Sequence, residues 1–369
     1  MPTRAHPDPS PRPAPTLWLL FGPKAGDNAQ LQAIADALAA RMRIRIEHRR
    51  LAFHAGELFV SLAQTPSLAG LSGASAQGLG PPWPDLILSS GRRNEPVARW
   101  IQRRTAGRCL LVHVGRPWAD PRRYDLVITT PQYFLDAWSR GRIRRLVLPP
   151  VPAIAADGPR DPALALLVGG DSGSQLLTAE AARSLGVRVR ELADQTGLGL
   201  RVSTSARTPP AAEAALRATL ATARDLEFFS WHGARQAGAG GLDNPYRAWI
   251  GSSSAFVVTA DSISMVADAA AQGRPLWLAP LPRATRPWWA TLRGWRWKAL
   301  THELAQRLAP RRFRRDTRRL LQGLVDARRA AWLGEPGPAE ADAMRAGEDA
   351  RTAATAIVAL LSGRDERTG

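Results

Sequence analysis

Short polar side chains follow an apolar run in the second half of the sequence, where a ligand site is expected. Residues 255–258 are apolar and partly β-branched, which predicts a buried strand. Asp261 and Ser262 come next and open a helix whose apolar residues recur at helical spacing. The unpaired N–H groups of a helix start, with the hydroxyls of Ser262 and Ser264, suit a phosphate or a sugar diphosphate. The alternative is that these side chains only cap the helix.

A glycine-rich loop, Gly169 to Ser174, also follows an apolar run and precedes a helix. Gly169 and Gly170 would let the backbone approach a ligand, and Ser172 and Ser174 could donate to phosphate oxygens. The loop is not a Walker P-loop, because no Gly-Lys-Ser/Thr ends it, and it lacks the dinucleotide spacing G-x-G-x-x-G. The alternative interpretation is a tight strand-to-helix turn.

Two further polar loops of this half carry groups that can bind phosphate or ribose. In the loop 204–209, the proline at the end suits a helix start, and Arg207 can clamp a phosphate with its fork of donors. Thr204 and Ser205 precede that arginine and are assigned to the same substrate site. Asn244 opens a short helix and is assigned to a base or a ribose. The alternatives are a helix cap with a solvated arginine for the first loop and a capping turn for the second.

The first half of the chain places charged residues on two similar strand-to-helix loops, which should lie at one edge of a parallel sheet. We assign these residues to the site: Lys24, Gly26, Asp27 and Asn28 on the first loop, and Arg92, Arg93 and Glu95 on the second. Asp27 or Glu95 could act as general base if its pKa is suitably tuned. A helix cap or a salt bridge is the alternative for either carboxylate.

Strands alternate with helices along the chain, and this order predicts an α/β fold. We expect two doubly wound, Rossmann-like domains that face a central cleft, where small-molecule sites are commonest. The expected strands are 17–21, 43–47, 85–89, 109–114 and 126–129 in the first domain, and 164–168, 200–204, 227–231, 255–258 and 276–278 in the second. The expected helices include 29–41, 176–195, 209–223, 245–252, 262–272 and a last one through 341–361.

Shifts in composition place the domain boundaries. Residues 1–15 are rich in proline and are expected to form a disordered tail. Residues 16–148 form the first domain, the five-proline segment 149–162 is a linker, and residues 163–282 form the second domain. Residues 283–369 are a basic Trp/Arg segment followed by helices that pack back on the domains.

Composition also excludes several classes of protein. No apolar run approaches the ~18 residues of a membrane-spanning helix, and the N-terminus lacks the apolar core of a secretory signal. Cys109 is the single cysteine, so no intrachain disulfide can form. The six histidines lack zinc-ligand spacing and no Asp-x-Asp follows a strand, so neither a metal nor a cofactor is expected. These features predict a cytoplasmic protein.

The formal net charge is +18, and much of the excess lies late in the chain. Residues 283–329 contain 14 Arg or Lys against 3 acids, and residues 283–298 interleave four tryptophans with five basic side chains. Three interpretations stay open: the segment packs the last helices, it lies on an anionic membrane surface through residues 283–319, or it stacks on single-stranded nucleic acid. Nucleic acid is the least favoured partner.

Seven motifs occur in a fixed order between Leu17 and Pro282. They are FGPKAGDNAQ, PDLILSSGRRNEPVARWI, VHVGRPWADPRRYDLVITTPQY, LLVGGDSG, STSARTPP, DNPYRAWI and TADSISMVADAAAQGRPLWLAP. As a set they resemble the bacterial branch of the elongated-mitochondria fission-protein family. The resemblance implies a two-domain GT-B glycosyltransferase-like fold, and it strengthens the expectation that Gly170, Asp261 and Ser262 touch a ligand. The family's plant members are associated with the mitochondrial surface and recruit a dynamin-related fission protein.

The sequence departs from the GT-B pattern at one place. Sugar-nucleotide transferases of this type often carry a glutamate in the helix after the last motif, where it holds the ribose. This chain has Asp268 at the matching place, which is one methylene shorter, so the expected ribose contact is a point to test.

The resulting hypothesis is a metal-independent glycosyltransferase that uses a nucleoside-diphosphate sugar. The second domain would bind the donor, with Arg207, or Arg92 and Arg93, neutralising the leaving group. The first domain would bind the acceptor, which would be lipid-linked if the Trp/Arg segment rests on the inner face of the cytoplasmic membrane. The alternative is a non-catalytic adaptor that binds a membrane or a protein. A nucleotide-sugar epimerase is disfavoured, because the sequence lacks both G-x-G-x-x-G and a Tyr-x-x-x-Lys pair.

Overall fold

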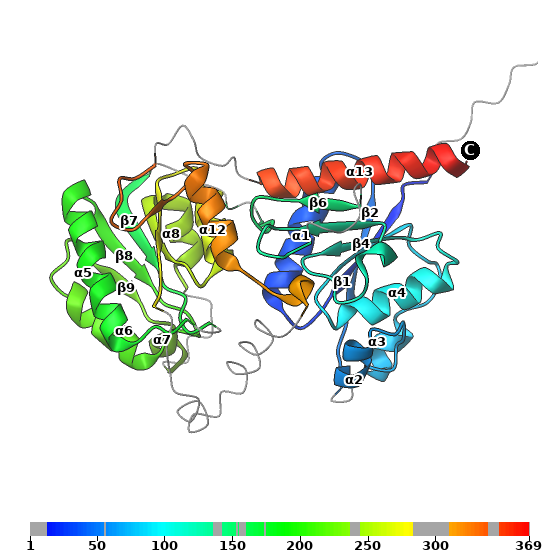
Figure 1. The fold of residues 1–369 in the computed structure, drawn as a ribbon, viewed down its shortest axis with the longest axis horizontal. Coiled ribbons are helices and arrows are strands. Elements are labelled where there is room, and N and C mark those ends of the chain that lie inside the picture. The colour runs from blue at the N-terminus through cyan, green and yellow to red at the C-terminus, as the bar shows by residue number, and fades with distance from the viewer. Residues whose placement is uncertain are drawn as a thin grey trace, which may run out of the picture. The chain divides into compact units, whose positions relative to one another are not determined.

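The chain divides into two compact units, shown in Figure 1. Unit 1 comprises Met1–Val127 with Ile357–Gly369, and unit 2 comprises Ile128–Ala356. The computed structural model describes residues 13–54, 57–135, 142–152, 154, 160–172, 175–236, 244–282, 310–338 and 347–368. Most of the predicted tail, the Trp/Arg segment 283–309, and the loop residues Gly173 and Ser174 lie outside the described residues.

The first sheet has the strand order β2-β1-β3-β4-β5-β6. Its strands are β1 (Thr16–Phe21), β2 (Arg45–Arg50), β3 (Leu86–Ser90), β4 (Leu110–Val114), β5 (Leu126–Thr129) and β6 (Ile143–Arg145). β1 pairs in parallel with β2 and with β3, and β3 pairs in parallel with β4. The strands β1, β3 and β4 are buried along almost their whole length. Burial on both faces explains why the sequence shows continuous apolar runs there instead of alternation.

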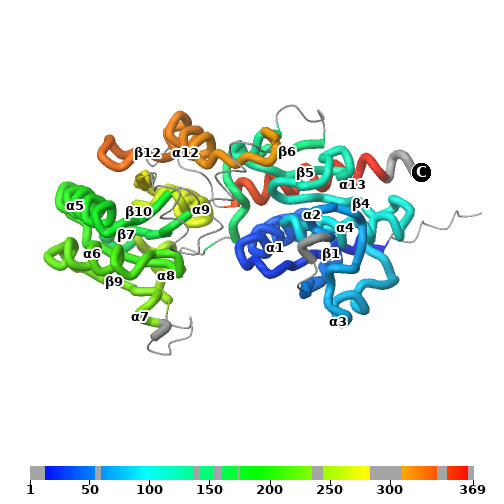
Figure 2. The backbone as a smooth tube through the Cα atoms, turned by 60° about the horizontal axis from the view of Figure 1, so that its bottom comes forward, coloured from blue at the N-terminus to red at the C-terminus, as the bar shows by residue number. Residues whose placement is uncertain are grey.

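Helices accompany these strands: all but the last of them lie between successive strands in the sequence, and the last one ends the chain. They are α1 (Ala25–Ala39), α2 (Glu57–Ala63), α3 (Gly73–Gln77), α4 (Asn94–Arg104), the 3-10 turn η1 (Pro121–Arg123) and the C-terminal α13 (Glu348–Thr368). α1 buries Leu31, Ile34 and Leu38, as its spacing predicts. The sequence predicts one short helix in the region 54–84, where the structure has α2 and α3. Figures 1 and 2 show α13 beside strands that come early in the sequence.

The second sheet is parallel throughout, with the order β12-β11-β10-β7-β8-β9. Its strands are β7 (Asp161–Leu167), β8 (Gly199–Ser203), β9 (Glu227–Phe229), β10 (Ser253–Thr259), β11 (Leu276–Ala279) and β12 (Ala331–Trp332). The helices are α5 (Ala179–Thr196), α6 (Pro210–Leu220), α7 (Trp231–Gln236), α8 (Tyr246–Ser252), α9 (Ile263–Ala270), η2 (Arg311–Phe313) and α12 (Thr317–Asp326).

Two separate hydrophobic clusters cover the two faces of this second sheet. One cluster joins Val202 of β8 to Leu185 of α5 and Leu216 of α6. The other joins Val258 of β10 to Val266 of α9, and it also includes three leucines of α12. Helices on both faces of a parallel sheet define the doubly wound architecture. The predicted fold class, α/β with two Rossmann-like domains, is confirmed.

The alternation of strands and helices continues beyond Pro282, where the sequence predicts that it stops. β12 pairs in parallel with β11, and α12 buries Leu320, Leu321 and Leu324 against the sheet. A strand of two residues is too short to show a periodicity, and the six arginines of residues 310–319 mask the amphipathic helix that follows.

Asp349, in the first turn of α13, is a buried carboxylate that fixes the segment after β6. Its two oxygens accept hydrogen bonds from the backbone N–H groups of Val147 and Leu148, both at 2.9 Å. Burial raises the pKa of Asp349 to about 6, although the two N–H groups and Arg329 act in the opposite direction. The folded state therefore binds this proton more tightly than the unfolded chain, whose aspartate pKa is 3.8.

We expect the free energy of unfolding to fall as pH rises, because the buried Asp349 carboxyl group then ionises. The contribution of this group to stability is greatest below the unfolded pKa and is lost as pH rises through the folded value, a change of about 2 kcal/mol between pH 4 and pH 7. In Asp349→Asn this pH dependence should disappear. Urea unfolding of both proteins at several pH values measures the difference, and a difference that stays constant with pH would contradict the assignment.

Candidate functional site

The strand order of each sheet reverses at one place, and loops from the two sides meet there. In the second sheet the reversal lies between β7 and β10, and in the first sheet it lies between β1 and β3. Ligands of open parallel sheets bind outside the carboxyl ends of the strands at such a switch point. The residues after β7, β8 and β10 are therefore the candidate site of unit 2, and those after β1 and β3 are the candidate site of unit 1.

The loop after β7 is fastened to the loop after β10 through its two glycines. The Gly169 N–H donates to Thr259 Oγ1 at 2.7 Å, and the Gly170 N–H donates to Asp261 Oδ2 at 3.0 Å. A Cβ on Gly169 would lie 2.3 Å from Asp261 Oδ2, and a Cβ on Gly170 would lie 2.1 Å from the Arg207 carbonyl oxygen. The missing side chains of these glycines therefore make room for Asp261 and Arg207 of the same chain. The sequence suggests instead that they make room for a ligand.

Asp261 and Arg207 form an ion pair at the centre of this arrangement. Arg207 Nη1 lies 2.8 Å from Asp261 Oδ2, and the aspartate side chain has no exposed surface while 41% of the arginine side chain is exposed. Burial raises the pKa of Asp261, and the charge of Arg207 opposes that shift. A ligand at this site would contact the exposed Arg207 and not the buried Asp261. The role of Asp261 is then to orient the Arg207 guanidinium.

The hydroxyl groups after β8 bind other parts of the protein. Ser205 Oγ and Thr208 Oγ1 both donate to the Gly169 carbonyl, the second at 2.6 Å. Thr204 Oγ1 donates to Glu213 at 2.9 Å and accepts from the Trp231 N–H at 3.0 Å. Thr204 and Ser205 thus fix the shape of the loop that carries Arg207.

The start of α9 is the remaining part of the predicted diphosphate site. Ser262 is the N-cap residue and is buried, but its side chain makes no capping hydrogen bond to the helix. Ser264 is exposed in the first turn. Ser172, from the loop after β7, instead pairs through its backbone N–H and C=O with Gln175, both at 3.0 Å.

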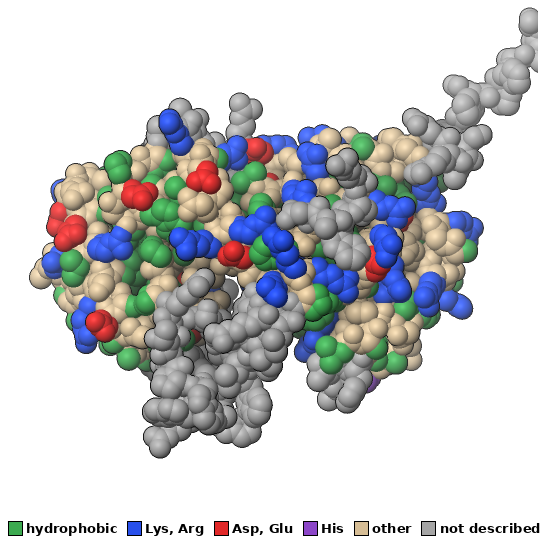
Figure 3. All heavy atoms as spheres, in the orientation of Figure 1, with side chains coloured by type: hydrophobic (Ala, Val, Ile, Leu, Met, Phe, Trp, Pro, Cys, Tyr) green, Lys and Arg blue, Asp and Glu red, His purple; other side chains and the backbone are tan. Residues whose placement is uncertain are grey.

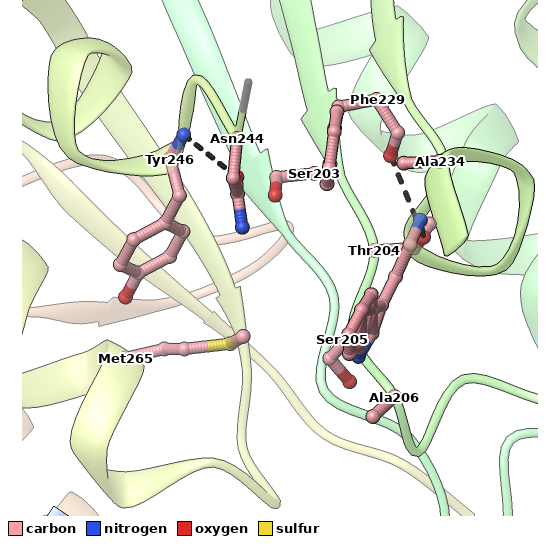
Figure 4. Close-up of a pocket in the computed structure, with 10 residues that line it drawn as sticks. Ser203, Thr204, Ser205, Ala206, Phe229, Ala234, Asn244, Tyr246 and Met265 are labelled. Atoms are coloured by element: carbon pink, nitrogen blue, oxygen red, sulfur yellow. Dashed lines mark hydrogen bonds between the residues drawn. The ribbon is translucent and has the colours of Figure 1, made fainter. Parts of the chain in front are cut away.

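A pocket of roughly 280 Å³ opens at the carboxyl ends of β8 and β9. Figure 4 shows Asn244, Tyr246 and Met265 on one side of it and Ser205 and Ala206 on the other. Three aromatic side chains, three serine and threonine hydroxyls and one amide are suited to a planar base with a few polar edges. The full lining is Ser203, Thr204, Ser205, Ala206, Phe229, Trp231, Ala234, Asn244, Tyr246 and Met265.

Asn244 and Asp268 both accept hydrogen bonds from Tyr246. Asn244 Oδ1 accepts from the Tyr246 N–H at 3.0 Å, which is the capping turn considered as the alternative. Asp268 Oδ2 accepts from the Tyr246 hydroxyl at 2.8 Å, so this oxygen already has a partner other than a ribose. Burial raises the pKa of Asp268, with the tyrosine hydroxyl opposing the shift. The sequence offered no signal for Tyr246 as a pocket wall, because its position depends on α8 and α9 together.

In unit 1 the loops after β1 and β3 meet as expected. Asn28 bridges the turn after β1, accepting from the Gly22 N–H at 3.0 Å and donating to the Gly22 carbonyl at 2.9 Å. A Cβ on Gly91 would lie 3.0 Å from Asp27 Oδ2, so this carboxylate lies against the turn after β3. Lys24, the N-cap residue of α1, and Gly26, in the first turn of this helix, are exposed.

Glu95 is buried in the core, and this position does not suit the catalytic role expected for it. Its side chain is fully buried, and its oxygens accept from the Trp118 N–H at 2.9 Å, the Ala119 N–H at 3.0 Å and the Tyr124 hydroxyl. His113 Nε2 lies 3.8 Å from the same carboxylate, and burial lowers the pKa of this histidine. We therefore leave Glu95 out of the reacting groups, and Asp27 is the carboxylate that stays in reach of solvent. Arg93 is exposed in the same turn.

The described part of the chain, residues 13–368 with the gaps given above, offers neither a metal site nor a membrane span. No group of three or more His, Cys, Asp or Glu residues there could bind a metal ion. No described helix is both long enough and apolar enough to cross a bilayer.

The sequence also matches one model of a protein family. The model describes mitochondrial fission ELM1 and matches residues 25–132 and 145–334. The chain belongs to the ELM1 family. The matched ranges contain every site residue assigned from the sequence except Lys24, which lies one position before them. A search of curated proteins gives no match.

Several solved structures share the architecture of this ELM1-family chain at low identity. An S. aureus MnaA–UDP complex is 13% identical with a TM-score of 0.47, covering 95% of this chain and 97% of that one. A UDP-GlcNAc 2-epimerase from Methanocaldococcus jannaschii is 11% identical with a TM-score of 0.47, covering 94% and 99%. The calicheamicin glycosyltransferase CalG4 is 14% identical with a TM-score of 0.43, covering 96% and 98%.

Proposed function

We propose that unit 2 binds a nucleoside-diphosphate sugar and that the protein is a glycosyltransferase that needs no metal. The observation that carries this proposal is the aromatic pocket at the ends of β8 and β9, which includes Ala206, the neighbour of Arg207. The pocket would take the base and ribose. The half-exposed guanidinium of Arg207 and the N–H groups that open α9 would take the diphosphate.

In the proposed reaction a hydroxyl oxygen of the acceptor attacks the anomeric carbon of the donor sugar. The bond from that carbon to the diphosphate oxygen breaks, and the nucleoside diphosphate leaves with the electron pair. The proton of the hydroxyl passes to a general base, the role for which Asp27 is the candidate from the sequence. Arg207 neutralises the charge that develops on the leaving group, which is the work that a divalent metal does in other transferases.

Calorimetry with uridine, adenosine and guanosine diphosphate sugars tests this proposal. We expect at least one to bind, and we expect Arg207→Gln to weaken it by about tenfold or more, because a charge-assisted hydrogen bond contributes about 1.5–3 kcal/mol. Arg183→Gln, an exposed arginine of α5, is the control and should leave the affinity unchanged. Binding that Arg207→Gln does not alter, or no binding by any donor, contradicts the proposal.

The alternative, a non-catalytic adaptor, is favoured by one described surface. Residues 310–319 contain six arginines and a single acid, Asp316, and Figure 3 shows basic side chains gathered over the beginning of α12. The guanidiniums of Arg311 and Arg319 lie 5.1 and 4.6 Å from the ring centroid of Phe134. Such a surface suits anionic phospholipid headgroups. Co-sedimentation with anionic vesicles and absence of nucleotide binding would together support the adaptor.

A further inference from the structure

Unit 1 gathers two guanidinium groups around one indole ring. The carbon at the centre of the Arg92 guanidinium lies 5.3 Å from the ring centroid of Trp118, and that of Arg116 lies 4.9 Å from it. Arg92 follows β3, while Arg116 and Trp118 follow β4. A guanidinium that contacts an aromatic ring is restrained and still presents N–H donors at its edge. We call these three residues the Arg–Trp–Arg cluster.

The position of the cluster is fixed from below by the buried carboxylate of Glu95. Both of its oxygens lie 2.9 Å from the Trp118 N–H, and one of them lies 3.0 Å from the Ala119 N–H. Glu95 itself belongs to the first turn of α4, the helix that begins two residues after Arg92. One buried group thus ties the loop after β4 to the helix that follows the Arg92 turn. A binding group supported in this way is preorganised, which reduces the cost of ordering it around a ligand.

Other polar groups share this edge of the sheet. The Asp27 carboxylate lies against Gly91, next to Arg92, since a Cβ on that glycine would be 3.0 Å from Asp27 Oδ2. Lys24 is exposed after β1, and Arg93 is exposed after β3. The switch point between β1 and β3 therefore combines several cations with one half-buried carboxylate.

We propose that unit 1 binds a small acceptor that carries both a hydroxyl and an anionic group, a phosphate or a carboxylate. Arg92 and Arg116 bind the anion, because the guanidinium fork matches the oxygens of either group. Asp27, beside Arg92, faces the neighbouring hydroxyl. The use of that hydroxyl as acceptor rests on the proposed function, whereas the binding of the anion does not.

The proposal is tested by titrating the full chain with glucose 6-phosphate, glucuronate and neutral glucose at low salt, with no nucleotide present. We expect one or both anionic probes to bind at least tenfold more tightly than glucose, and the two arms separate phosphate from carboxylate recognition. The double variant Arg92→Gln/Arg116→Gln should abolish this preference. Arg103→Gln, an exposed arginine at the far end of α4, is the matched control and should retain it.

Two further variants locate the site. Arg207→Gln should leave binding of the anionic probe unchanged, since it lies in unit 2. Trp118→Phe should remove the change in tryptophan fluorescence that the probe produces while retaining a folded protein by circular dichroism. Anionic probes that bind no better than glucose would overturn the proposal, as would a preference that survives in a folded double variant. Either failure is distinct from a failure of nucleotide-sugar binding, which depends on Arg207.

Discussion

Gly170→Ala is expected to lower the free energy of unfolding by about 4 kcal/mol. Losses of this size are typical only of severe backbone or packing conflicts. Gly170 has a φ of 147°, a conformation that side chains rarely adopt. The added methyl carbon would also lie 2.1 Å from the Arg207 carbonyl oxygen, which is backbone and cannot swing away as a side chain could. Because Arg207 would have to move, binding of the nucleotide sugar should be lost as well.

Gly26→Ala is the matched control for this prediction. A Cβ on Gly26 meets nothing within 4 Å, and the residue lies in the first turn of α1. Its stability should stay the same or rise slightly, because alanine favours a helix. Denaturant unfolding measures both variants. A Gly170→Ala protein as stable as the wild type would mean that the loops after β7 and β8 are not in contact.

Glu95→Ala is expected to cost about 4 kcal/mol, because three buried donors lose their acceptor at about 1–3 kcal/mol each. These donors are the N–H groups of Trp118 and Ala119 and the hydroxyl of Tyr124. Glu95→Gln should cost less, since it keeps one acceptor oxygen. Asp36→Ala, which removes an exposed carboxylate from α1, should change stability by at most about 0.5 kcal/mol.

The two possible roles of Glu95 give opposite results in this experiment. If the residue anchors the loop after β4, both variants lose stability in the order given. A general base could be removed with little loss of stability, and the damage would appear in turnover alone. A fully stable Glu95→Gln protein would therefore contradict the structural role and restore Glu95 as a catalytic candidate.

The architecture was predictable because its signals are local. Each buried strand is a short apolar run, and most are followed within two residues by glycine or a polar cap, so that the order of elements could be taken directly from the sequence. β2 begins at Arg45, two residues after the expected start, because its polar edge residues carry little hydrophobic signal. β12 is not predicted from the sequence for a related reason, because a strand of two residues is too short to show a hydrophobic periodicity.

The candidate site was predictable only as a set of loops. Parallel order places the residues after β7, β8 and β10 at one edge, as the structure has them. Which side chains face outward depends on packing between distant segments. Asp261 is buried because Arg207 covers it, and Glu95 is buried because the loop after β4 closes over it. The Arg–Trp–Arg cluster likewise joins two loops that no sequence motif connects.

The central claim, a nucleotide site in unit 2, is tested most directly by the methyl group of Met265. This residue lines the pocket and is one of only four methionines, so that methyl-labelled methionine gives a simple spectrum. Met265→Leu assigns its signal, and Met42 of unit 1 serves as an internal control. We predict that a bound nucleoside-diphosphate sugar shifts the Met265 signal and leaves that of Met42 in place. A saturating donor that leaves Met265 unshifted would contradict the claim.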